Sequence, residues 1–221
     1  MNKCLKSLCM IMIVVSLISY KVSAEEKKID NNKMKPEEKL KNETIGNKEH
    51  SGNTVVIQTD KGSIKIKLFV KDAPNTTSNF IDLVKKGFYN STVFHRVVEN
   101  FVIQGGDPLG DGTGSYVDPQ TNKPRYLKLE TNPKLKFDQA GRVGMARSRA
   151  ADSASCQFFI ALQALPSLDP GGVDENGYAV FGQVTEDTMK TVREIVKYSR
   201  PAFPGSDRPA NPVRMQSVVL E

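Results

Sequence analysis

The chain has 221 residues and a formal net charge of +6 at pH 7, with 31 basic residues against 25 acidic ones. This length suits one domain of ordinary size with appendages. A positive charge this small does not require a nucleic-acid partner.

The first 24 residues predict a secretory signal peptide. Lys3 and Lys6 provide a positive start, residues 8–20 form an apolar run of 13, and Val22-Ser23-Ala24 supplies small residues for cleavage. The alternative, an uncleaved membrane anchor, is disfavoured because a spanning helix needs roughly 20 apolar residues. We therefore expect export, to the periplasm or outside the cell, with no membrane association after cleavage.

Loss of this leader would lower the charge from +6 to +3 and leave Cys156 as the single cysteine, so no internal disulfide is expected. Residues 25–53 hold seven lysines and seven acids with few apolar residues, which predicts a disordered charged linker. The folded domain is expected to span residues 54–221.

The domain begins with a predicted hairpin at residues 54–70, turning at Asp60-Lys61-Gly62. A helix is expected next, with Asp72 as its cap, Pro74 in its first turn and Gly87 at its end. The stretch "FHRVVENFVIQGGD" (94–107) predicts a second hairpin. Further strands are predicted at 125–130, 141–148, 156–162, 178–184 and 213–221, and a second helix at 186–199. About eight strands and two helices indicate a mainly β fold, a closed antiparallel β-barrel capped by two α-helices.

The motifs of common catalytic chemistries are missing from the domain. It contains one histidine, His95, and no G-x-S-x-G sequence, which disfavours a Ser-His hydrolase. One His and one Cys cannot make a metal site, and the glycine-rich stretch 106–114 matches neither a calcium loop nor a phosphate loop. The three arginines of 141–153 lack interleaved aromatic residues and are a weak nucleic-acid signal. A reaction that needs neither nucleophile nor metal fits better, and rotation about an X–Pro bond is one.

Five motifs occur in a specific order: "FHRVVENFVIQGGD", "GTG", "GMARS", "SCQFFIAL" and "YAVFGQV". On these motifs the domain resembles the cyclophilin family of peptidyl-prolyl cis-trans isomerases over roughly residues 54–221. The stretches "DSASCQFFI" and "GYAVFG" look most like the corresponding sequences of exported bacterial members of the family. The resemblance implies an eight-stranded barrel with its site on the outer face, no cofactor, and proline-containing polypeptides as partners. We expect a monomer that acts as a folding catalyst on exported proteins.

The resemblance also implies the site. Arg96 matches the catalytic arginine, and Gln104 would hold its guanidinium or bind substrate backbone. The positions that match the proline pocket and peptide groove are Phe101, Val102, Ala146, Arg147, Gln157, Phe159, Leu168 and Tyr178. Four positions depart from the common family pattern: Val102 for Met, Arg147 for Asn, Ser167 for Trp and Tyr178 for His. Because cyclosporin uses the missing indole, its binding is expected to be weak.

Arg96 and Gln104 must share one face of their hairpin to share a site, which requires a connection with an odd number of residues. A loop at 98–100 would place Arg96 opposite Val102 and Phe94 opposite Gln104. No acid within "FHRVVENFVIQGGD" is in reach to pair with Arg96. Two other functions stay open: a non-catalytic module or chaperone that binds prolyl segments, and an adhesin that uses the linker and the basic surface.

Overall fold

A computed structural model describes residues 52–221 of the chain. The predicted signal peptide at 1–24 lies outside the described residues, as does the predicted linker at 25–53 except its last two residues. Within residues 52–221, neither α-helix has the length and apolar character needed to cross a membrane.

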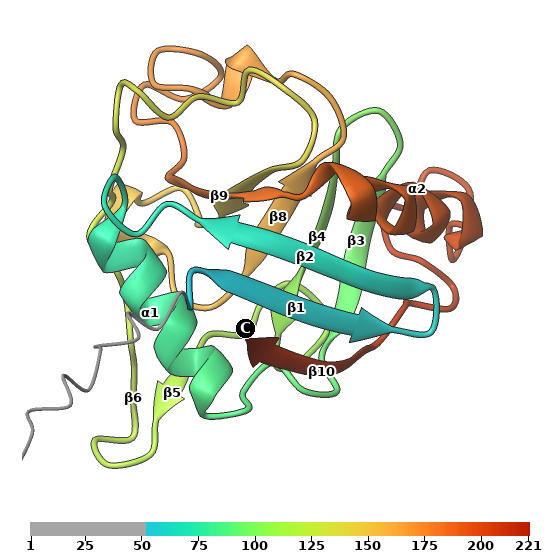
Figure 1. Cartoon of the computed structure of the whole chain (residues 1–221), viewed down its shortest axis with the longest axis horizontal. Coiled ribbons are helices and arrows are strands. Elements are labelled where there is room, and N and C mark those ends of the chain that lie inside the picture. Colours follow the sequence, from blue (N-terminus) through green and yellow to red (C-terminus); the bar gives the residue numbers. More distant parts are fainter. Residues whose placement is uncertain (1–51) are drawn as a thin grey trace, which may run out of the picture. The chain divides into compact units, whose positions relative to one another are not determined.

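An eight-stranded antiparallel sheet forms the domain, as predicted (Figure 1). The strand order is β10-β1-β2-β9-β7-β8-β4-β3. The strands are β1 (Thr54–Thr59), β2 (Gly62–Leu68), β3 (Val93–Val98), β4 (Val102–Asp107), β7 (Arg142–Met145), β8 (Phe158–Ala161), β9 (Val180–Val184) and β10 (Met215–Leu220). Two α-helices accompany them, α1 (Pro74–Lys85) and α2 (Met189–Tyr198), and Figure 1 shows these on opposite sides of the barrel.

The two end strands of the sheet meet and close the barrel. Val93 of β3 bridges Arg214 just before β10. The amide of Phe94 donates to the carbonyl oxygen of Val213 at 2.9 Å, and the amide of Met215 donates to the carbonyl oxygen of Thr92 at 2.8 Å. Closure removes the free edges that an open sheet would expose.

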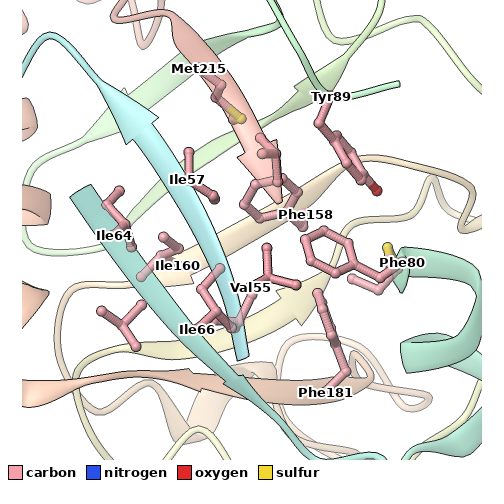
Figure 2. Close-up of a cluster of buried hydrophobic side chains, with 14 of the residues drawn as sticks. Val55, Ile57, Ile64, Ile66, Phe80, Tyr89, Phe158, Ile160, Phe181 and Met215 are labelled. Carbon is pink, nitrogen blue, oxygen red and sulfur yellow. The ribbon is translucent and has the colours of Figure 1, made fainter. Parts of the chain in front are cut away.

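Alternating side chains of the strands fill the barrel interior (Figure 2). In β2, Ile64, Ile66 and Leu68 are buried while the lysines between them face outward, as the alternation predicts. Aromatic rings from α1 and three strands complete the core; the Phe80 and Phe158 rings pack edge to face with centroids 5.4 Å apart. The labelled core residues in Figure 2 are Val55, Ile57, Ile64, Ile66, Phe80, Tyr89, Phe158, Ile160, Phe181 and Met215.

The cap of α1 differs from the prediction. Ala73, not Asp72, precedes the first turn, and it provides no side-chain cap. The Glu130 carboxylate takes that role from a distant segment, accepting hydrogen bonds from the amides of Asn75 at 3.1 Å and Thr76 at 2.8 Å. Gly87, with φ of +66°, follows the helix as expected.

The predicted strand at 125–130 is wrong. Only one bridge forms there, between Leu127 and Ala154. Arg125 and Glu130 are instead bound to α1, where Arg125 Nη1 lies 2.7 Å from Asp82 Oδ2, so the segment runs along the helix. A small hairpin that the sequence analysis missed, β5 (Val117–Asp118) with β6 (Lys123–Pro124), precedes this segment.

Candidate active site

The β3–β4 hairpin places Arg96 directly opposite Gln104. Its loop has three residues, 99–101, between the paired residues Val98 and Val102. The expected odd connection is confirmed, and Arg96 and Gln104 share a face. The expected register is wrong: the loop begins one residue later than expected, so Arg96 pairs with Gln104 and not with Val102, two residues away. Within this loop Asn100 has a φ of +60°, in the left-handed region that asparagine tolerates.

A bulge at His95 turns Arg96 outward. Phe94 pairs with Gly105 and Arg96 with Gln104, so His95 is an extra residue in β3. Without it, Phe94 and Arg96 would lie on one face, since residues two apart share a face in a regular strand. With it, Phe94 is fully buried in the barrel while Arg96 faces the outer surface with its side chain 35% exposed.

The outer face carries a row of site residues across four strands. Arg96 of β3 pairs with Gln104 of β4, Gln104 pairs with Phe159 of β8, and Phe159 pairs with Gly144 of β7. Gly144 leaves room for the rings of Phe159 and Phe137, which stack with centroids 5.4 Å apart. An apolar cluster outside the barrel therefore supports this row, and it includes Val102, Leu168 and Val180.

A cavity of about 240 Å³ opens over this row. The predicted site residues that line it are Arg96, Phe101, Val102, Gln104, Ala146, Arg147, Phe159, Leu168 and Tyr178. The roles assigned to these residues remain predictions, but the fold brings them together from three strands, one 3-10 helix and three loops. Gln157, the tenth predicted residue, lines a neighbouring cavity of about 260 Å³.

Gln157 connects the two cavities by hydrogen bonds. Its Oε1 accepts a hydrogen bond from Gln104 Nε2 at 3.0 Å. Its own Nε2 donates to the carbonyl oxygens of Gly112 at 3.0 Å and Gly114 at 2.8 Å. The Gln104 amide is thus oriented by Gln157, and it makes no hydrogen bond to Arg96 in the described structure. The suggestion that Gln104 holds the guanidinium therefore finds no support in this geometry, while its contact with substrate stays a prediction.

Arg96 has an acidic partner, contrary to the sequence-based expectation. Arg96 Nε donates to Asp207 Oδ2 at 3.0 Å, and Nη2 lies 3.0 Å from the same oxygen. The guanidinium carbon also lies 5.8 Å from the centroid of the Phe101 ring. Among residues 52–221, no hydrogen bond is made by Nη1. Asp207 is 111 residues away in sequence, in the loop before β10, and no local pattern could have revealed it.

Arg147 stabilises one wall of the cavity. Its side chain is only 1% exposed; Nη2 lies 2.7 Å from Asp174 Oδ1 and also donates to the carbonyl oxygen of Gly177 at 2.7 Å. The guanidinium lies over the Tyr178 ring, 4.6 Å from its centroid. The side chain thus fixes the loop that carries Tyr178, so substrate contact at Arg147 would have to come from its backbone.

The neighbouring cavity is more polar and was largely missed by the sequence analysis. It shares Gln104, Ala146 and Arg147 with the first and extends to the 112–115 loop. Its other side chains are those of Tyr126, Ser148, Ser153 and Ser155. The signals that pointed to this region were the "GTG" motif, the end of "GMARS" and the start of "SCQFFIAL" with Gln157.

Cys156 and His95 are both buried, and neither lines either cavity. Burial raises the pKa of the Cys156 thiol to about 12, so it stays protonated at neutral pH. Burial likewise lowers the pKa of His95. Within residues 52–221, no group of three or more His, Cys, Asp or Glu side chains could hold a metal ion.

The cyclophilin type peptidyl-prolyl cis-trans isomerase/CLD family matches residues 54–220. Curated relatives include a spliceosome-associated protein CWC27 homolog of Danio rerio, 36% identical over 163 residues. Another is the peptidylprolyl isomerase cyp7 of Schizosaccharomyces pombe, 39% identical over 160 residues. The matches cover 74% and 68% of this chain, but 32% and 31% of the relatives, so the chain spans about a third of their length.

A solved structure is similar over nearly its whole length. It is the crystal structure of a Cryptosporidium parvum cyclophilin type peptidyl-prolyl cis-trans isomerase in the presence of the dipeptide Ala-Pro. The two proteins are 30% identical with a TM-score of 0.66, over 76% of this chain and 98% of the other.

The comparisons contradict the expected export to the periplasm or outside the cell. Relatives from Danio rerio and Xenopus laevis are named as spliceosome-associated proteins, and a further one is the peptidyl-prolyl isomerase cwc27 of the fungus Rhizopus delemar; none of these three is an exported bacterial protein. The similarity to exported bacterial members, inferred from "DSASCQFFI" and "GYAVFG", is likewise not supported. These two stretches lead into β8 and β9 and include the first three residues of each strand, where barrel packing and the site constrain the residues, so they do not report on the compartment.

Proposed function

The chain belongs to the cyclophilin type peptidyl-prolyl cis-trans isomerase family, and we propose that it accelerates rotation about X–Pro bonds in polypeptides, without covalent chemistry and without a cofactor. One observation carries this proposal: the Arg96 guanidinium lies at a cavity walled by apolar side chains, and Nη1 forms no hydrogen bond within the described residues. Phe101, Val102, Phe159 and Leu168 provide the apolar surface.

The chemistry follows from the electronic structure of the bond. Delocalisation of the nitrogen lone pair into the carbonyl gives a rotation barrier of ~18–20 kcal/mol. In the twisted transition state the lone pair is localised on the prolyl nitrogen and can accept a hydrogen bond. The planar ground state barely accepts one, so a donor placed there stabilises the transition state selectively. Arg96 supplies this donor, because its guanidinium stays protonated.

The remaining site residues hold the substrate. The apolar wall seats the proline ring, so that the acyl side of the bond rotates, and it keeps water from competing for Arg96. Gln104 Oε1 makes no hydrogen bond within residues 52–221, while its Nε2 is held by Gln157, and this orientation suits an acceptor for a substrate amide. A rate gain of about a hundred-thousandfold needs ~7 kcal/mol. One charged hydrogen bond supplies ~2–3 kcal/mol, so positioning and exclusion of water must supply the rest.

The test is a coupled isomerisation assay of the full chain on a peptide with an Ala-Pro bond, comparing wild type with Arg96→Ala and Arg96→Lys. We expect Arg96→Ala to lower kcat/KM by roughly a hundredfold, since one transition-state hydrogen bond is worth that much. Arg96→Lys should recover part of the loss, because it keeps the charge but not the geometry. Wild-type activity in Arg96→Ala would contradict the proposal.

A second function is favoured by the relatives that are named as spliceosome-associated. In that case the domain would dock prolyl segments of protein partners in a larger assembly, with turnover unnecessary. Measurements of peptide binding and of isomerisation rate distinguish the docking function from the catalytic one. A docking module would bind the Ala-Pro peptide, seen as NMR shifts of the cavity residues, while the wild-type protein showed no acceleration of isomerisation.

A further inference from the structure

Asp207 contacts the proposed catalytic arginine at one edge. Arg96 Nε and Nη2 both lie 3.0 Å from Asp207 Oδ2. These two nitrogens share an edge of the planar guanidinium, so the ion pair occupies that edge and leaves Nη1 for other partners. The Phe101 ring lies against the same group, 5.8 Å from the guanidinium carbon. An acid at one edge and a ring beside it restrict the rotamers of a side chain that is otherwise long and mobile.

Asp207 is itself held in place by the backbone. Its carbonyl oxygen accepts a hydrogen bond from the amide of Val97, the residue after Arg96, at 2.8 Å. The loop that carries it is closed by a hydrogen bond from the amide of Ala202 to the carbonyl oxygen of Arg208 at 2.8 Å. The carboxylate therefore reaches Arg96 from a backbone position fixed beside β3.

The ion pair is too exposed to be a major source of stability. The side chains of Arg96 and Asp207 are 35% and 52% exposed, and pairs of this kind contribute little to the folding free energy. Its main physical effect is on geometry: it sets the direction in which the free N–H groups point. Positioning of a donor matters more for a transition state than for a loosely bound ground state.

We propose that Asp207 is a positioning residue for the isomerase reaction: it orients the Arg96 guanidinium so that Nη1 is presented to the twisted prolyl nitrogen. The inference rests on the proposed function of Arg96. It predicts that loss of the Asp207 carboxylate lowers kcat while the ground-state affinity for peptide is unchanged.

The experiment measures kcat and KM of the full chain with an Ala-Pro peptide for Asp207→Ala, Asp207→Asn and Asp207→Glu. We expect Asp207→Ala and Asp207→Asn to lower kcat by about tenfold with KM within about twofold of wild type, the size expected for a misdirected donor. Asp207→Glu should recover part of the activity. Glu221→Gln is the matched control, because it removes another exposed ion pair, Lys65 Nζ to Glu221 Oε2 at 3.1 Å, away from both cavities.

A second readout separates positioning from general disruption. In an Arg96→Lys background, which lacks the Nε–H that Asp207 binds, Asp207→Ala should cause no further loss of kcat. Thermal unfolding of Asp207→Ala should match that of Glu221→Gln. A wild-type kcat in Asp207→Ala, or an equal loss in both backgrounds, would overturn the inference. A wild-type rate in Arg96→Ala would contradict the proposed function itself. A loss of rate in Arg96→Ala with a wild-type rate in Asp207→Ala would contradict only the role of Asp207.

Discussion

Gln104 of β4 and Gln157, the residue just before β8, are joined by their side chains, with Gln104 Nε2 donating to Gln157 Oε1 at 3.0 Å. Gln157 also binds two carbonyl oxygens of the 112–114 loop. One amide thus orients a cavity residue and anchors the wall of the neighbouring cavity.

Replacement of Gln157 should therefore impair peptide binding more than folding. We expect Gln157→Ala to raise KM for a tetrapeptide with a central Ala-Pro bond by roughly tenfold. The substitution removes three hydrogen bonds of about 1 kcal/mol each, and hydrogen bonds to water replace part of that energy. The measurement is the isomerisation assay with thermal unfolding in parallel. Gln163→Ala is the control, since Gln163 makes a comparable bond to the carbonyl oxygen of Asn100 at 2.7 Å without lining either cavity. An unchanged KM in Gln157→Ala would count against this role.

Gly144 should be intolerant of a side chain. A Cβ at this position would overlap both the Phe159 and the Phe137 rings, which stack under the cavity. We expect Gly144→Ala to lower the free energy of unfolding by about 1–3 kcal/mol through overpacking, and to reduce activity because Phe159 shifts. Chemical denaturation and the isomerisation assay test this. Gly52→Ala is the control, since its nearest contact would be the Leu220 side chain at 3.3 Å, with no overlap.

Acid should weaken the loop that Arg147 holds. The hydrogen bond from Arg147 lowers the pKa of Asp174 below its usual 3.8. A carboxyl whose pKa is lower in the folded state stabilises the fold above its unfolded pKa, and this contribution is lost as the pH falls through the folded pKa. The melting temperature of Asp174→Asn should therefore lie below that of wild type at pH 7. The difference should shrink below pH ~4 and vanish at the lowest pH. A difference independent of pH would show that the ion pair is not its source.

Cyclosporin should inhibit this protein poorly. The family resemblance predicts this from Ser167, which stands where many members have tryptophan; the structure places it at an exposed position of the 3-10 helix Pro166–Leu168. Ser167→Trp should strengthen inhibition by at least tenfold if the indole is the missing contact. Inhibition of the wild type at nanomolar drug would contradict the prediction.

Much of the fold could be predicted from local patterns. Alternation in β2, the apolar stripe of α1 and the family motifs indicated the barrel and ten site residues, and the fold gathers nine of these at one cavity. The predicted strand at 125–130 does not form because tertiary contacts override local alternation: Glu130 and Arg125 bind α1, and the segment pairs with other backbone through a single bridge, Leu127 to Ala154. The prediction of an exported location was wrong because motifs of the site and of the core carry no information about the cellular compartment.

The sequence by itself determined which residues alternate into the core, since this depends on neighbours two to four positions apart, and its resemblance to a known family indicated which motifs belong to the site. Only the tertiary structure decided how the polar groups are paired. The His95 bulge turns Arg96 outward, Asp207 reaches it across 111 residues, and Arg147 is buried under the loop that it holds. Pairings of this kind depend on which segments the closed barrel brings side by side, and no local periodicity encodes that proximity.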